Sequence, residues 1–268
     1  GYGLSTEAEL KILEIIKKLN QEHKLDIIPT FLGAHAFPEE FKNNRKEYIR
    51  ILTQEMIPQV SQKKLAEFCD VFCENGYFTI EESKQILEAG KKFGLKPKVH
   101  ADELGNSGGS QVAADVGAIS ANHLVYAVDD DIEKMQKANV IAVLLPGTSF
   151  FLASRYAPAH KMIVKGLPVA LGTDFNPGSS MTESMQIVMT LAGLYLKMTP
   201  AEVIVASTIN SAYALNRGDQ IGSLEAGKKA DLVIWEVANF KEIPYHYGVN
   251  LVEKVIKNGK VVYQRSRS

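Results

Sequence analysis

The fold class is decided by one stretch, Lys98-Val99-His100-Ala101-Asp102-Glu103, in which a short β-type segment ends in ionisable side chains. Two other segments end in the same way, Ala121-Asn122-His123-Leu124 and Leu171-Gly172-Thr173-Asp174-Phe175-Asn176. Parallel (β/α) barrels collect metal ligands and acid–base groups at the carboxyl ends of their strands. These endings favour a TIM-type α/β fold, with hydrolysis by a metal-activated water as the leading interpretation.

Six β-rich segments alternate with helical segments along most of the chain. Each is nearly continuous in apolar residues or ends in a functional group, as strands buried on both faces do. Such alternation calls for a parallel sheet with right-handed crossovers. The predicted strands are Asp26–Leu32, Asp70–Cys73, Pro97–Ala101, Ala118–Leu124, Val140–Leu145 and Pro168–Thr173.

Capping boxes, each a Thr followed three residues later by a Glu, mark helix starts at Thr6, Thr79 and Thr199. A longer helical pattern covers Arg45–Phe68, in which Pro58 predicts a kink or a break. The glycine-rich stretch Leu104–Ser110 lacks the lysine and the spacing of a phosphate-binding loop. We therefore interpret it as a flexible loop beside the site.

The composition changes after Asn216-Arg217-Gly218-Asp219, and the remaining segments are β-rich. Asn258-Gly259 lies between two alternating β runs, which predicts a tight hairpin. About fifty residues cannot close a β-sandwich alone, so we expect this tail to pair with strands from elsewhere. The predicted domains are a partial barrel over residues 1–218 and part of a small composite β-sandwich over residues 219–268.

The overall composition excludes several classes of protein. A chain of 268 residues with 46% apolar residues can bury a large core, and its net charge of −1 gives no case for nucleic-acid binding. No apolar stretch is long enough to span a membrane, and the first residues lack a secretory pattern. Cys69 and Cys73 are interpreted as two buried thiols in a reducing cytoplasm.

Two of the ionisable residues close the third predicted strand. His100 has the side chain of a common divalent-metal ligand, although a histidine there can equally be a core residue bonded to backbone. Glu103 follows in the loop, where a carboxylate can move a proton between water and a leaving nitrogen. The alternative is an exposed acid at a helix start.

Three further residues lie at the ends of other predicted strands. His123 can polarise a carbonyl oxygen or stabilise the oxyanion that forms when water attacks. Asp174 can ligate a metal and orient the attacking water, although an Asp there can also cap a turn or helix. His35 ends the first predicted strand, so it is expected at the same edge of the sheet.

The motifs His-Ala-Asp-Glu, Asn-His-Leu and Gly-Thr-Asp-Phe-Asn-Pro-Gly, with the late block Gly222–Val233, resemble the amidohydrolase superfamily. The blocks Gly1–Leu4, Phe31–Ala36 and Pro244–Asn250 resemble the imidazolonepropionases within it. The resemblance extends from end to end of the chain. The Gly-Thr-Asp and Gly-Ser-Leu-Glu-Ala-Gly blocks are common to the superfamily, so only the other stretches favour the narrower group.

The resemblance implies hydrolysis of the ring amide of 4-imidazolone-5-propanoate to N-formimidoyl-L-glutamate, in histidine degradation. It implies one zinc or iron ion held by His100 and Asp174, with Glu103, His123 and Asp174 as catalytic residues. It also implies a cytoplasmic homodimer that binds this small molecule. The implied substrate contacts are Tyr2, His35, Glu103, Asn176, Gly178 and Ser179.

The chain departs from the family pattern in one respect. The family has a His-x-His pair at the end of its first barrel strand, and no such pair occurs in these 268 residues. We therefore expect strands three to eight of the barrel without strands one and two, and weak metal binding and no activity from this chain alone. The alternatives are another amidohydrolase, such as a deaminase or another cyclic amidase, and a non-catalytic fragment that self-associates.

Overall fold

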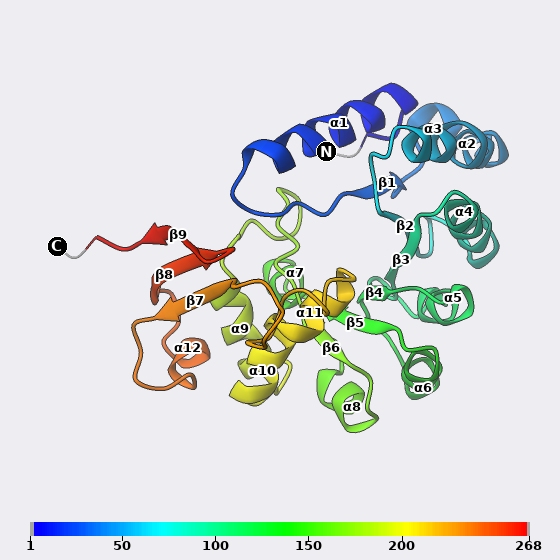
Figure 1. Ribbon diagram of the computed structural model, residues 1–268. Helices are drawn as coiled ribbons and strands as arrows, with labels where there is room; N and C mark the ends of the chain where they lie inside the picture. The colour runs from blue at the N-terminus through cyan, green and yellow to red at the C-terminus, as the bar shows by residue number, and fades with distance from the viewer. Residues whose placement is uncertain (1–2, 267–268) are drawn as a thin grey trace. The chain divides into compact units, whose positions relative to one another are not determined.

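The structure is a computed structural model that describes residues 3–266, so Tyr2 lies outside the described residues. The chain divides into two compact units, Gly1–Val140 and Ile141–Ser268. The first unit contains β1 to β4 and the second contains β5 to β9 (Figure 1). The predicted division of the chain after Gly218 stays a prediction.

Four parallel strands organise the first unit: β1 (Thr30–Ala34), β2 (Phe68–Cys73), β3 (Lys96–Ala101) and β4 (Ser120–His123). They pair in chain order, β1 with β2, β2 with β3 and β3 with β4. These strands confirm the predicted segments, except that β1 begins later than Asp26. Their carboxyl ends, which carry the polar side chains, therefore lie along one edge of the sheet.

The helices of the first unit pack on these strands, with α1 against β1, α4 against β2 and α5 against β3. The capping box at Thr79 is confirmed, because its side chain accepts from Glu82 N and the Glu82 side chain accepts from Thr79 N. The bounds are α1 (Thr6–Glu22), the 3₁₀ turn η1 (Glu39–Phe41), α2 (Arg45–Ile51), the π-helical segment η2 (Leu52–Met56), α3 (Ile57–Gln62), α4 (Ile80–Lys92), α5 (Gly109–Val116) and α6 (Asp129–Lys137).

Two helix predictions are wrong in their details. The cap of α1 is Ser5 and not Thr6, because Ser5 Oγ accepts the N–H of Ala8 at 3.2 Å. Glu9, the expected partner of Thr6, is instead buried and accepts the N–H of Leu32 at 2.9 Å. The helix expected over Arg45–Phe68 is interrupted by a π-helical segment and ends at Gln62, since the chain must turn before it enters β2.

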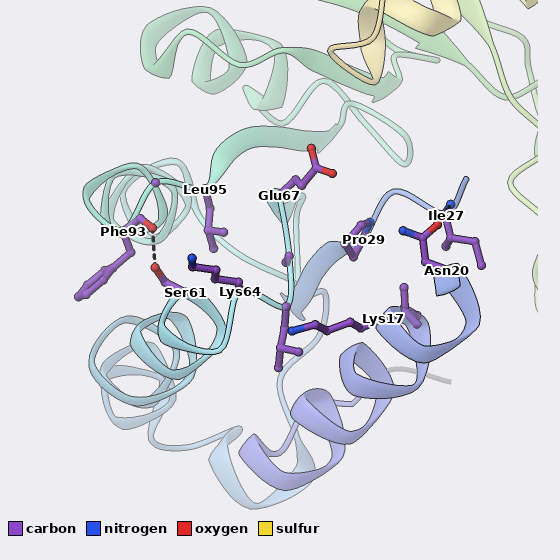
Figure 2. A pocket seen from close by; sticks show the side chains of 13 residues that line it. Lys17, Asn20, Ile27, Pro29, Ser61, Lys64, Glu67, Phe93 and Leu95 are labelled. Carbon is purple, nitrogen blue, oxygen red and sulfur yellow. Dashed lines mark hydrogen bonds between the residues drawn. The ribbon is translucent and has the colours of Figure 1, made fainter. Parts of the chain in front are cut away.

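A cavity of about 480 Å³ opens at the amino ends of β1, β2 and β3 (Figure 2). Lys17 and Asn20 of α1 line one side, and Ser61, Lys64 and Phe93 line the other. The polar residues singled out by the sequence follow the carboxyl ends of the same strands. This cavity is therefore at the opposite end of the strands from those residues.

The second unit contains the parallel pair β5 (Ile141–Leu144) and β6 (Val169–Leu171), which confirms the last two predicted strands. The capping box at Thr199 is confirmed at the start of α10. None of the helices described for residues 3–266 has both the length and the apolar character needed to cross a membrane. The helix bounds are α7 (Pro146–Phe151), α8 (Ala159–Val164), α9 (Met185–Leu194), α10 (Pro200–Ser207), α11 (Ile209–Ala214) and α12 (Glu242–Tyr245).

The end of the chain forms an antiparallel sheet of β7 (Leu232–Trp235), β8 (Val252–Lys257) and β9 (Lys260–Gln264), in that order. The predicted hairpin is confirmed, because β8 and β9 pair across Asn258-Gly259. Both turn residues have positive φ, 50° and 75°, as a tight hairpin turn of matching twist requires.

Candidate functional site

Three imidazoles at the ends of β1, β3 and β4 of the first unit meet at the carboxyl edge of the sheet. His35 follows β1, His100 lies near the end of β3 and His123 closes β4. The ring centroids of His35 and His100 are 5.1 Å apart, and those of His100 and His123 are 5.3 Å apart. The structure therefore brings together the three histidines that the sequence singled out.

Glu103 joins this histidine cluster. Its Oε2 lies 3.5 Å from Nε2 of His123, whose side chain is 5% exposed. Asp102, which follows β3, and His123, which closes β4, both have positive φ, 50° and 72°. Residues other than glycine rarely adopt this conformation, and it is common at functional sites.

Two buried carboxylates hold the loop that carries Glu103. Glu74 Oε2 accepts the N–H groups of Glu103 and Leu104, each at 2.9 Å. Asp102, which is fully buried, accepts the N–H groups of Ser107 at 2.9 Å and Ser110 at 3.0 Å. A buried carboxylate needs hydrogen-bond donors, so Glu74, Asp102 and the backbone of the loop stabilise one another.

The predicted loop Leu104–Ser110 is partly helical, because its last two residues begin α5, a helix that the sequence did not predict. The Ser107 hydroxyl donates to Glu74 and the Ser110 hydroxyl donates to Asp102, in addition to the backbone bonds. Hydrogen bonds to charged acceptors are stronger than those between neutral groups. The flexibility of this stretch stays a prediction.

Two rings of the histidine cluster, those of His35 and His123, are neutral at physiological pH. Burial lowers the pKa of His35 to about 4, and the neighbouring His100 adds to this effect. Burial also lowers the pKa of His123 well below its ordinary value, and the neighbouring His100 and His35 lower it further. Neutral rings retain a lone pair, so they can ligate a metal or exchange hydrogen bonds with a substrate.

Sequence reasoning missed two acids that act on this cluster. Asp70 lies in the middle of β2, and its Oδ1 is 2.6 Å from Nδ1 of His100. Glu74 binds the loop as described above. The available signal was burial, because an acid inside or just after a strand as apolar as Phe68–Cys73 must find a partner.

Asp174 belongs to the second unit, where it follows β6 with a φ of 50°. The hydroxyl of Thr148, at the start of α7, donates to Asp174 Oδ2 at 2.5 Å. Asn176 Nδ2 donates to the carbonyl oxygen of Asp174 at 2.7 Å. These bonds fix the carboxylate and the turn after it.

Three of the implied substrate contacts, Asn176, Gly178 and Ser179, lie in one turn and bind one another. Asn176 Oδ1 accepts the N–H groups of Gly178 at 2.9 Å and Ser179 at 2.8 Å. The Asn176 amide also donates to the hydroxyl of Ser179 at 3.0 Å. The polar groups therefore bind one another here, and their role toward a substrate stays a prediction.

The donor chemistry of His100 and Asp174 fits a divalent ion. A metal-binding imidazole usually has its second nitrogen held by a carboxylate, as Asp70 holds Nδ1 of His100. Within residues 3–266, however, no group of three or more His, Cys, Asp or Glu side chains is arranged to hold a metal. Tight sites need at least three protein ligands, and the assignment of His100 and Asp174 as ligands stays a prediction.

Comparison with known proteins places these residues in a family. The sequence profile of the Amidohydrolase family matches residues 45–262. An imidazolonepropionase of Shouchella clausii is 55% identical over 264 residues, with 98% of this chain and 59% of that protein covered. An imidazolonepropionase of Geobacillus kaustophilus is 57% identical over 262 residues, with 98% and 62% covered. The chain thus spans less than two thirds of the length of these curated relatives.

Solved structures agree on the fold. A zinc-bound adenosine deaminase from Xanthomonas campestris matches with a TM-score of 0.73 at 19% identity, covering 93% of this chain and 63% of the other. A guanine deaminase from C. acetobutylicum matches with a TM-score of 0.72 at 16% identity, covering 97% and 70%. These likenesses establish an α/β TIM-type fold with a parallel sheet. From the matched profile and this fold, we conclude that the chain belongs to the amidohydrolase family.

Proposed function

We propose that this chain functions in the hydrolysis of 4-imidazolone-5-propanoate to N-formimidoyl-L-glutamate in histidine degradation, as an imidazolonepropionase. The observation that carries the proposal is the cluster of His35, His100 and His123 with Glu103 beside it. Curated relatives with 52–57% identity over nearly the whole chain are imidazolonepropionases by name, which supports the choice of substrate.

In this proposal His100 and Asp174 hold one divalent ion, zinc or iron. Such an ion supplies Lewis-acid chemistry when it is bound. His100 contributes a ring whose orientation is already set by Asp70, and Asp174 contributes a carboxylate held by Thr148. The same ligand types serve zinc and iron, so the residues do not select between them.

Glu103 moves the proton in the hydrolysis. Its carboxylate accepts a proton from the attacking water and then donates it to the ring nitrogen that leaves as the amide bond breaks. The bonds from Glu74 to the Glu103 and Leu104 backbone hold it next to His123.

His123 stabilises the charge that develops on the carbonyl oxygen. Because burial keeps its pKa low, the ring is neutral and can donate one hydrogen bond to that oxygen. His35 contacts the imidazolone ring, and its own plane is held by stacking on Phe72, at 5.0 Å and 12°. We assign contacts with the propionate tail to Tyr2, Asn176, Gly178 and Ser179.

The finer architecture follows the same proposal. The parallel strands correspond to strands three to eight of a (β/α) barrel, and β7 to β9 correspond to part of a small β-sandwich. The enzyme acts on a small molecule in the cytoplasm as a homodimer. The two alternatives, a different amidohydrolase reaction and a non-catalytic fragment, are not favoured by the names of the curated relatives.

Ring opening of the substrate tests the proposal directly. The chain is assayed after zinc or iron loading, first alone and then co-expressed with the part of the Geobacillus kaustophilus relative that it leaves uncovered. We expect no ring opening from the chain alone and ring opening from the combination, lost in Glu103→Gln. The exposed acid Glu81 provides the control Glu81→Gln, which should leave the rate unchanged. No ring opening by either preparation, or a rate that is insensitive to Glu103→Gln, contradicts the proposal.

A further inference from the structure

Asp70 is a buried acid in an apolar strand. It is 2% exposed and lies in β2, all of whose residues are buried. In the register of β2 and β3, Asp70 pairs with Lys98 and Phe72 pairs with His100. Side chains two residues apart on a strand share a face, so Asp70 and His100 lie diagonally on the same face.

The Asp70 carboxylate bonds to two neighbouring strands. Its Oδ1 lies 2.6 Å from Nδ1 of His100, and its Oδ2 accepts from Nδ2 of Asn122 at 3.4 Å. A carboxylate only accepts hydrogen bonds, so the short contact requires Nδ1 of His100 to carry the hydrogen. In the neutral form of the ring, Nε2 then carries the lone pair.

The plane of the His100 ring is held as well as its tautomer. The ring of His35 meets it edge-on, at 5.1 Å and 79°, and Phe72 meets it at 5.9 Å and 73°. His123 lies on a further side, at 5.3 Å. These contacts still allow a ring flip that would exchange the two nitrogens. The bond between Asp70 and Nδ1 of His100 opposes that flip.

A packing role alone does not account for an acid at this position. Removing a carboxylate from water is costly, and well-packed apolar residues often replace buried ion pairs without loss of stability. An apolar side chain between Phe68 and Phe72, which share this face of β2, would pack there without that cost. Asp70 lies opposite the partly buried Lys98 in the strand register, and its Oδ1 also meets an imidazole nitrogen of His100.

We infer that Asp70 is a positioning residue that fixes the neutral His100 ring in the Nδ1–H tautomer, so that Nε2 carries the lone pair that a metal ligand needs. The inference rests on the proposed function for the identity of the ligand. It goes beyond that proposal because it assigns a role to Asp70, which is not one of the reacting groups. It also concerns the tautomer of His100 before any ion binds.

The tautomer is measured by long-range proton–nitrogen correlation NMR on the chain with ¹⁵N-labelled histidine, without metal and at a pH where the rings are neutral. The His100 signals are assigned by their loss in His100→Gln. We expect the Nδ1–H form to predominate in the wild-type chain and the Nε2–H form to gain population in Asp70→Asn. Predominance of the Nε2–H form in the wild type would overturn the inference even if the variant fails to fold.

Zinc affinity gives a second readout, measured by competition with a chromophoric chelator. Replacing a residue that orients a metal ligand typically weakens metal binding about 10–100-fold, and we expect a loss in this range for Asp70→Asn. The matched control is Asp131→Asn, since Asp131 is also buried and hydrogen-bonded but contacts Asn106 and the Val128 N–H instead of an imidazole. It should change neither the tautomer nor the affinity.

The two readouts separate the inference from the proposed function. A folded Asp70→Asn chain with unchanged tautomer populations overturns the positioning role. A wild-type chain that has the Nδ1–H tautomer but whose zinc affinity is unaffected by His100→Gln contradicts the ligand assignment, while the tautomer result still supports Asp70 as the residue that orients the ring.

Discussion

The substitution Glu74→Gln tests how firmly the loop that carries Glu103 is held. Glu74 is 3% exposed, and its carboxylate accepts from the Glu103 and Leu104 N–H groups at 2.9 Å and from the Asn75 N–H at 3.1 Å. A glutamine amide has one accepting oxygen, so its NH₂ group must face donors that previously had a partner.

The expected cost follows from these contacts. Hydrogen bonds to charged groups contribute about 1.5–3 kcal/mol each, and at least one or two are lost, so we expect unfolding free energy to fall by ~3 kcal/mol. Since 1.4 kcal/mol corresponds to a factor of ten, the amides of Glu103 and Leu104 should exchange with solvent roughly 100-fold faster.

Urea unfolding and amide hydrogen exchange measure the two effects. The control Glu81→Gln removes the same charge from an exposed position on α4, and surface changes of this kind usually stay within about 0.5 kcal/mol. If Glu74→Gln matches the control in stability and leaves the exchange of both amides unchanged, the loop is not held by this carboxylate and the reasoning is refuted.

Two other predictions follow from buried ionisable groups. Burial raises the pKa of Glu9, so the folded state holds this proton more tightly than the unfolded state and loses stability as the pH rises above the ordinary value of 4.5. Glu9→Gln should therefore improve stability more at pH 7.5 than at pH 4.5 in paired urea titrations, and an equal change at both would contradict the prediction. Burial also raises the pKa of Cys69, and it raises the pKa of Cys73 to about 11. Alkylation of both thiols by iodoacetamide should follow the urea unfolding curve, and labelling of the folded chain at the rate of a free thiol would contradict this.

The strands of this fold were predictable because each one is a nearly continuous apolar run. Strand ends also located His35, His100 and His123 on one edge, since parallel strands place their carboxyl ends together. Where a helix begins with a Thr and a Glu at the right spacing, as at Thr79 and Thr199, the local sequence was enough to place it.

The remaining features depend on partners far apart in the chain. Asp70 and His100 are separated by 30 positions, and Glu74 and Leu104 by 30, so no local pattern links them. The start of α5 was missed because Gly108, with a φ of 85°, precedes the helix and suggested a loop. The anchor that fixes this helix start is Asp102, whose burial is a property of the folded chain.

We propose that His100 and Asp174 bind one divalent ion beside Glu103 and His123, and anomalous diffraction at the zinc edge from crystals of the zinc-loaded chain tests this site. We expect a single zinc peak within coordination distance of His100 Nε2 and an Asp174 carboxylate oxygen. A zinc peak that contacts neither residue, or one bound through Nδ1 of His100, would contradict the proposed site.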